Sequence, residues 1–358
     1  MADVTASSRG RGSLEGAKRL LSFGNIGAVY VWIVIIAVFW IWLPDTFPTL
    51  ETVRGILNNN AVTGLVALSL VVPLCTRMFD LSVTANVGLC NMFIAYLLAE
   101  THWAIAVCVG MTLLLAIVLG LLNVFVVVIL KIDSIIATLA TAALMAAATT
   151  MISNDEPINT ERLAGSFERI AGGTALGVTL PVFYLLAAAA LIWFLLEHTA
   201  TGRRLYATGF NSTAARLAGV KTRPLQALSL MISALTAGIA GIVLTSRVGA
   251  GSPGIGPPYL LIGFAAVFLG ATQLKAGRFN AWGTIIAVLL LGTGTEGLSL
   301  AAAPVWASNV FTGVVLIASL AVTGVQRTRI RRGARRDPAP AQPAPPPDRT
   351  AGPAQQAA

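Results

Sequence analysis

Ten apolar runs separated by short polar segments constrain this chain more than any other feature. Only 11% of its 358 residues are charged, whereas soluble domains carry about a quarter. Runs of about 20 apolar residues cross a bilayer as helices, because hydrocarbon forces every backbone amide to bond within its own segment. We therefore expect an all-α, polytopic membrane protein, a helical bundle of about ten transmembrane helices near residues 28–43, 61–76, 82–99, 104–130, 134–152, 179–196, 225–246, 259–271, 282–299 and 304–325.

The two weakest of these runs are 61–76 and 259–271, which are short enough to be tilted, broken or re-entrant. Ten spans place both termini on one side of the membrane. Of the 24 Lys and Arg residues, 20 fall on that side, and only Arg54, Arg162, Arg169 and Arg247 fall on the other. Since cytoplasmic loops are rich in Lys and Arg, we expect the N- and C-termini in the cytoplasm.

This topology also explains the net charge of +9. The basic residues are scattered along one membrane face without an interleaved aromatic surface, which argues against nucleic-acid binding.

Polar segments divide the chain further. Residues 1–27 are basic and lack a small-residue cleavage site, which predicts a cytoplasmic tail. Residues 326–358 pass from an arginine cluster into a Pro/Ala-rich tract, which predicts a disordered cytoplasmic tail with its arginines at the lipid surface. The membrane domain is then 28–325, with a cytoplasmic block at 198–224. The acidic extracytoplasmic loop 153–177 is either simply solvated or a landing surface for an external partner.

Motifs of soluble catalysts are missing. The chain has no G-x-x-x-x-G-K-[ST] sequence to cradle ATP phosphates and no H-E-x-x-H sequence, so nothing argues for an enzyme and no cofactor is expected on it. GAGSPG at 249–254 and GTGTEG at 292–297 match G-x-G-x-x-G, but neither follows a strand. The three cysteines lie in apolar runs without ligand spacing, so we expect neither a metal site nor a disulfide.

Polar residues in and beside the spans are candidates for a translocation path, because an unsatisfied polar group in hydrocarbon is costly. The segment RMFDLSVTANVGLCN at 77–91 holds several, and Asp80 or Ser82 can cap the first amides of the following span. Two interpretations stay open, namely capping with interhelical hydrogen bonds, or the lining of a pathway. The candidate path residues are Asp80, Ser82, Asn86, Asn91, Asn123, Thr138 and Thr141.

The segment TGRRLYATGFNSTAARLAGVKTRP at 201–224 is basic and punctuated by glycine. We expect Gly202 and the pair Arg203 and Arg204 to end the preceding span, Asn211 to cap a two-turn helix, and Gly219 to stop it. Its apolar face would comprise Ala214, Leu217 and Ala218. A helix so short is unstable alone in water, so it needs headgroups or a protein partner to dock against.

The same segment resembles the cytoplasmic coupling loop of sugar-type ABC importer permeases, of the ribose, xylose and galactoside branch. Further similar segments follow in family order over residues 28–325: FPTLETVRGIL at 47–57, FDLSV at 79–83, KIDSIIATLATAAL at 131–144, DEPINT at 155–160 and AAVFLGATQLKAGRFNAWGT at 265–284. Two departures stand out. Thr84 replaces the glycine of DLSVG, and QLKAGRFN at 273–280 replaces a glycine-rich stretch.

The resemblance implies a multi-pass permease of the bacterial inner membrane that imports a monosaccharide or similar small hydroxylated solute. It also implies partners: an ATP-binding subunit holding ATP and Mg²⁺, an extracytoplasmic solute-binding protein, and a second permease copy or paralogue. The residues that would couple to the ATPase are Arg203, Arg204, Gly209, Asn211, Ala214, Arg216, Leu217 and Gly219.

The alternative function is an ion- or proton-coupled secondary carrier. Such a carrier is expected to place titratable groups at mid-membrane depth, and only Asp80 and Glu296 come near it.

Overall fold

The computed structural model of the chain describes residues 23–274 and 277–318. Within these ranges the fold is a helical bundle, as expected, and each predicted run contains a helix. The helices are α2 (Phe23–Trp42), α3 (Leu50–Cys75), α4 (Val83–Glu100), α5 (Ile105–Val124) with its π-helical continuation η1 (Phe125–Ile129), α6 (Ser134–Ser153), α9 (Leu180–His198), α12 (Thr222–Val248), α13 (Pro258–Ala271), α14 (Ala281–Leu300) and a last helix Val305–Ala318. Seven of them are long and apolar enough to span a membrane, and Val29–Trp42, α13 and the last helix are shorter apolar helices.

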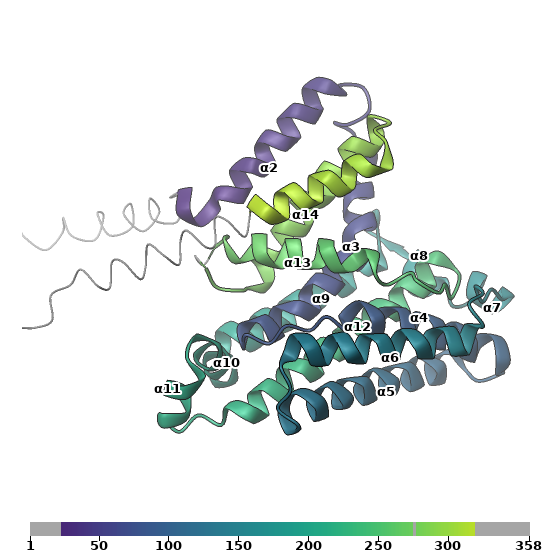
Figure 1. The fold of residues 1–358 in the computed structure, drawn as a ribbon. Helices are drawn as coiled ribbons and strands as arrows, with labels where there is room; N and C mark the ends of the chain where they lie inside the picture. Colours follow the sequence, from purple (N-terminus) through teal and green to yellow (C-terminus); the bar gives the residue numbers. More distant parts are fainter. Residues whose placement is uncertain (1–22, 275–276, 319–358) are drawn as a thin grey trace, which may run out of the picture.

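The two ends of the bundle differ in what they carry (Figure 1). The short helices α10 (Ala200–Phe210) and α11 (Ser212–Leu217) lie at one end, together with the first turn of α2. The short helices α7 (Glu161–Ala164) and α8 (Arg169–Gly172) lie at the opposite end. Because the basic block 198–224 forms α10 and α11, the excess of Lys and Arg there predicts that their end is the cytoplasmic one.

The helices α3 and α12 form the centre of the bundle. From Ala61 to Cys75 every residue of α3 is buried. α12 packs against α3, α4 and α5, while α14 packs against α3, α13 and α2. α3 therefore joins the group of α4, α5, α6 and α12 to the group of α2, α13 and α14.

The largest difference from the expected spans is at the start of α3, which begins at Leu50 rather than at 61. Thr49 caps this helix, since its hydroxyl oxygen accepts a hydrogen bond from the Thr52 amide at 3.1 Å. The added turns include Asn58, Asn59 and Asn60, which lower the local hydropathy. α2 likewise begins at Phe23, inside the segment expected as a tail, and the rest of both tails lies outside the described residues.

The loop 153–177, which is expected on the extracytoplasmic side, folds into a compact unit packed on the bundle. Besides α7 and α8 it contains the antiparallel strands β1 (Thr174–Ala175) and β2 (Val178–Thr179), in which Thr174 pairs with Thr179 and Ala175 with Val178. Leu163 and Phe167 are fully buried in one apolar cluster with residues of α4. The loop is therefore held firmly on the bundle.

Candidate functional site

The cytoplasmic block does not begin as the sequence suggests. Gly202, Arg203 and Arg204 were expected to end the preceding span, but α9 ends at His198 and all three lie inside α10. Thr199 has an extended backbone, which breaks the helix, and its hydroxyl oxygen caps the new one by accepting the Gly202 amide at 3.0 Å. The block is thus two short helices rather than one.

α10 is fixed to the cytoplasmic end of α3 by a close backbone contact. A Cβ atom at Gly209 would lie 1.9 Å from the carbonyl oxygen of Cys75, so only glycine fits this position. On the same side of α10, Leu205 and Thr208 are buried. The helix therefore sits rigidly against the bundle.

Tyr206 joins α10 to the segment between α13 and α14. Its hydroxyl donates a hydrogen bond of 2.7 Å to the carbonyl of Phe279, and the Arg278 guanidinium carbon lies 4.0 Å from the centre of its ring. Burial raises the pKa of the Tyr206 hydroxyl well above its usual range. The group therefore stays a hydrogen-bond donor at any physiological pH.

The expected cap and stop of α11 are both confirmed. The Asn211 side-chain oxygen accepts the amides of Thr213 at 3.1 Å and Ala214 at 3.0 Å. Gly219 has a φ of 82°, a left-handed conformation that suits glycine at a helix end. The Val220 amide then closes the turn on the Ala215 carbonyl at 2.9 Å.

The apolar face of α11 points away from the chain's own bundle. Ala215 is the buried side chain of this helix, whereas Ala214, Leu217 and Ala218 are exposed. Leu217 is 86% exposed and Phe210, at the end of α10, is 84% exposed. Both apolar side chains therefore stand at the cytoplasmic end without cover from the described part of the chain.

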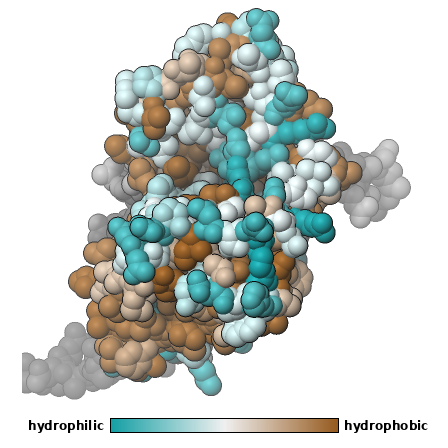
Figure 2. Space-filling view, turned by 90° about the vertical axis from the view of Figure 1, so that its right-hand side faces the viewer, coloured by the Kyte–Doolittle hydropathy of each residue, from teal (hydrophilic) through white to brown (hydrophobic). Residues whose placement is uncertain are grey.

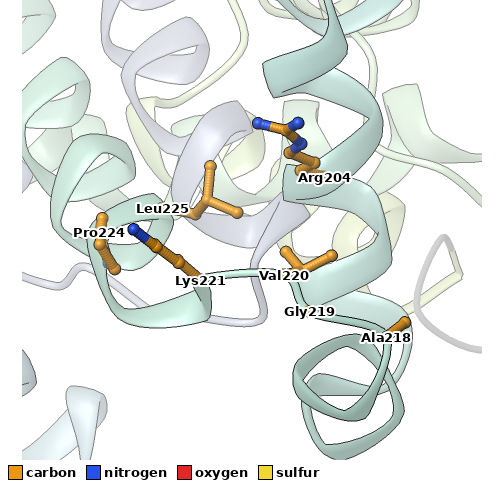
Figure 3. A pocket seen from close by; sticks show the side chains of 7 residues that line it. All are labelled: Arg204, Ala218, Gly219, Val220, Lys221, Pro224 and Leu225. Carbon is orange, nitrogen blue, oxygen red and sulfur yellow. The ribbon is translucent and has the colours of Figure 1, made fainter.

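Three basic side chains of the same two helices, Arg203, Arg204 and Arg216, are also exposed. A groove of about 510 Å³ lies beside them, between α10 and the start of α12 (Figure 3). Figure 3 shows its lining residues, which are Arg204, Ala218, Gly219, Val220, Lys221, Pro224 and Leu225. Seven of the eight predicted coupling residues are thus exposed on α10, α11 and the turn after α11, whereas Gly209 is buried against α3. Their role in coupling stays a prediction.

Most of the candidate path residues meet in a buried hydrogen-bonded network. Thr141 of α6 donates to the side-chain oxygen of Asn123 at 2.6 Å, the Asn123 side-chain amide donates to the Ser82 hydroxyl at 2.7 Å, and that hydroxyl donates to Asp80 at 2.6 Å. The second carboxylate oxygen of Asp80 accepts the Ser233 hydroxyl of α12 at 2.8 Å. The network therefore ties the segment before α4 to three other helices.

The caps expected before α4 differ in detail. Ser82 is the N-cap residue but makes no side-chain cap bond, and Asp80 accepts the Ser82 amide instead of the first helical amides. Thr138 belongs to the same region, where its hydroxyl oxygen accepts the Leu81 amide at 3.0 Å. A buried carboxylate needs several donors, and the short turn before α4 supplies them better than the helix start does.

Asn86 and Asn91 lie outside this chain of bonds. The Asn86 amide donates to the Ala234 carbonyl at 3.2 Å. Asn91 donates to the Thr245 hydroxyl at 2.8 Å and accepts the Ser252 amide at 2.9 Å. All seven candidates are buried and bonded between segments, which matches the first interpretation left open by the sequence; a pathway role for them stays a prediction.

Two features of the structure, an apolar groove and a cluster of hydrogen-bonded polar side chains, were not predicted from the sequence. An apolar groove of about 470 Å³ runs along α13, lined by Phe79, Leu81, Pro257, Leu260, Leu261, Phe264, Phe268 and Leu316. Phenylalanines spaced four residues apart on α13 were the available signal.

The second feature lies at the extracytoplasmic end, where hydrophilic side chains form a band across the middle of the molecule (Figure 2). Arg247 of α12 donates to the Asn58 carbonyl and to the Asn59 side chain, both at 2.7 Å. The Asn59 amide in turn donates to Glu296 of α14 at 3.2 Å. The run of three asparagines at 58–60 could have signalled this cluster.

Metal-binding geometry is lacking in residues 23–274 and 277–318, where no three His, Cys, Asp or Glu residues are grouped to hold an ion. Cys75, Cys90 and Cys108 are buried free thiols.

Comparison with known proteins places the chain among permeases. Residues 52–320 match the family model described as "Branched-chain amino acid transport system / permease component". The chain belongs to this permease family. It is a multi-pass protein of the bacterial inner membrane and the transmembrane component of an ABC-type importer, rather than a secondary carrier.

Several curated relatives of this permease are similar along most of their length. The ribose import permease protein RbsC of Bacillus subtilis (strain 168) is 29% identical over 82% of this chain and 90% of the relative. RbsC of Escherichia coli (strain K12) is 30% identical over 81% and 90%. The L-arabinose transport system permease protein AraH of the same organism is 32% identical over 89% and 96%. No solved structure matches the chain.

Proposed function

We propose that this permease imports a monosaccharide or a similar small hydroxylated solute, and that a separate ATP-binding subunit docked on α10 and α11 drives the transport. In this proposal ATP and Mg²⁺ are held by that subunit, because the permease sequence has no P-loop. A solute-binding protein delivers the solute from outside, and a second permease copy or paralogue completes the path.

The observation that carries this proposal is the exposed apolar pair Phe210 and Leu217. Exposed apolar side chains grouped at an aqueous end are typical of a protein interface. The exposed arginines of α10 and α11 can bind acidic groups of the partner with paired hydrogen bonds. The close packing at Gly209 and the cap at Asn211 hold the surface in one place, which lowers the entropic cost of docking.

The solute class is supported by the relatives. Their names assign ribose and L-arabinose to those proteins, and their similarity extends over most of the chain. The family description mentions branched-chain amino acids, whereas the relatives named above are named for sugars. We therefore favour a monosaccharide.

The docking proposal is tested by Leu217→Asp. A charge in the centre of an apolar interface is costly to bury, so we expect this variant to lose association with its ATP-binding subunit in detergent and to lose ATP-dependent uptake. Leu176→Asp is the matched control, because Leu176 is 93% exposed in the turn between β1 and β2 at the other end. Unchanged association of Leu217→Asp would refute the assigned surface.

The solute proposal needs a different measurement. The cognate solute-binding protein should bind a pentose or hexose, and uptake by the complete importer should follow the same order of preference. Binding of branched-chain amino acids, without sugar binding, would contradict it.

A further inference from the structure

We propose that Tyr206 transmits the movement of α10 to the corner between α13 and α14, the turn that holds Phe279 and Asn280. Tyr206 is therefore a positioning residue for transport. The inference rests on the proposed docking of an ATP-binding subunit at α10 and α11. It adds the route by which that movement reaches the membrane helices.

The first step is the contact itself. α10 packs mainly on α9, α12 and α3, but the Tyr206 side chain extends to the segment before α14. There its hydroxyl bonds the Phe279 carbonyl at 2.7 Å, and its ring lies under the Arg278 guanidinium. The Cys75 thiol also approaches this carbonyl, at 3.7 Å, a longer and weaker contact.

The second step is the stiffness of the corner. The Asn280 side chain donates to the carbonyls of Gly270 at 3.3 Å, Gln273 at 3.1 Å and Arg278 at 3.0 Å. Its oxygen accepts the Gly283 amide at 2.7 Å and so caps α14. The end of α13 and the start of α14 are thereby joined through one side chain, and a displacement of Phe279 moves both helices together.

The third step leads from the corner to the apolar groove. The Phe279 ring packs edge-on against Phe268 with centroids 5.6 Å apart. Phe268 stacks on Phe264 at 6.2 Å and lies 6.5 Å from Phe79. Phe79, Phe264 and Phe268 all line the groove along α13. A movement that enters at Phe279 therefore reaches the wall of this groove.

Tyr206 differs from Gly209 in what its loss would change. The Gly209 contact fixes the position of α10, so altering it disturbs packing. Removing only the Tyr206 hydroxyl keeps the ring, its Arg278 contact and the exposed docking surface. Tyr206→Phe therefore removes the contact proposed for transmission and leaves the docking surface unchanged.

The test compares Tyr206→Phe with Tyr184→Phe in the importer reconstituted with its ATP-binding subunit and solute-binding protein. Tyr184 on α9 is also half-buried, and its hydroxyl makes none of the hydrogen bonds observed among the described residues. We expect Tyr206→Phe to keep subunit association and ATP hydrolysis, but to lower solute transported per ATP by about fivefold, the effect of losing one good hydrogen bond. The bond lost is the one to the Phe279 carbonyl at 2.7 Å, since the second contact of the hydroxyl, to Glu197 Oε1, is long at 3.5 Å. Tyr184→Phe should match the unmodified importer.

A double variant tests whether the route is shared. Arg278→Gln removes the charge above the ring, and if both residues act on one corner, Tyr206→Phe with Arg278→Gln should lower the transport ratio by less than the product of the two single effects. An unchanged ratio in Tyr206→Phe would overturn the proposal. Loss of subunit association in Tyr206→Phe would also overturn the proposal, because it would assign Tyr206 to docking. Loss of association in Leu217→Asp, with association kept in Tyr206→Phe, is the result that both proposals expect.

Discussion

Gly209→Ala tests the attachment of the cytoplasmic helices most directly. The added Cβ would lie 1.9 Å from the Cys75 carbonyl oxygen, 2.9 Å from the Cys75 carbonyl carbon and 3.2 Å from the Thr76 Cα. All three are backbone atoms, so no change of rotamer relieves the overlap. α10 and the end of α3 have to separate instead.

The size of the effect follows from these distances. Carbon and oxygen atoms approach to about 3.3–3.6 Å, so α10 must move by more than about 1 Å. The same shift stretches the 2.7 Å bond between Tyr206 and Phe279 beyond hydrogen-bonding range. Overpacking costs about 1–3 kcal/mol and the lost hydrogen bond about 1 kcal/mol, so we expect a destabilisation of about 2–4 kcal/mol.

The assay is thermal unfolding of the purified permease in detergent, followed by uptake in the complete importer. Gly110→Ala is the matched control, since a Cβ at Gly110 on α5 would meet no atom within 4 Å. Alanine is the better helix former by about 1 kcal/mol, so this control should be neutral or stabilising. If Gly209→Ala unfolds at the same temperature as Gly110→Ala, the close contact of α10 with α3 is refuted.

Three further predictions concern the other parts of the site. Arg216→Glu should abolish ATP-dependent uptake while membrane insertion stays intact, because it reverses a charge beside the docking surface; normal uptake would contradict the coupling assignment. Asp80→Leu removes the acceptor of three hydrogen bonds, each costing about 1–3 kcal/mol when a buried donor is left unsatisfied. It should therefore unfold at a lower temperature than Asp80→Asn, which keeps one acceptor, and equal unfolding temperatures would count against the network. A reporter fused after residue 165 should be located outside the cytoplasm, and a reporter fused after residue 211 should be located inside it. Any other pair of locations would contradict the predicted topology.

Hydropathy was sufficient for the bundle because most spans are continuous apolar runs. It failed at the start of α3, where Asn58 is bonded to Thr179 and to Arg247, and Asn59 to Arg247 of α12 and Glu296 of α14. It also failed at α10, where Gly202 and Gly209 lower the helix propensity. Packing explains the second failure, since the Gly209 contact requires glycine inside a helix.

The bounds of the short helix α11 were more predictable than the contacts of the candidate path residues. The cap at Asn211 and the stop at Gly219 depend on neighbouring residues only, so local rules were enough. The contact of Tyr206 with Phe279 joins residues 73 positions apart, and no local pattern reports it. For Asn123 and Asp80 the sequence gives approximate depth but not direction, so it cannot distinguish a side chain bonded to another helix from one that lines a path.

The bond between Asp80 and Ser233 also has a consequence for biosynthesis. The two residues are 153 positions apart, and ribosomes add about 5–20 residues per second, so Asp80 is made roughly 8–30 s before Ser233. During that interval α4, α5 and α6 can enter the bilayer and supply Asn123 and Thr141, while one oxygen of the carboxylate still lacks its donor. The arrival of α12 completes the network, which makes this helix the one that closes the first half of the protein during membrane insertion.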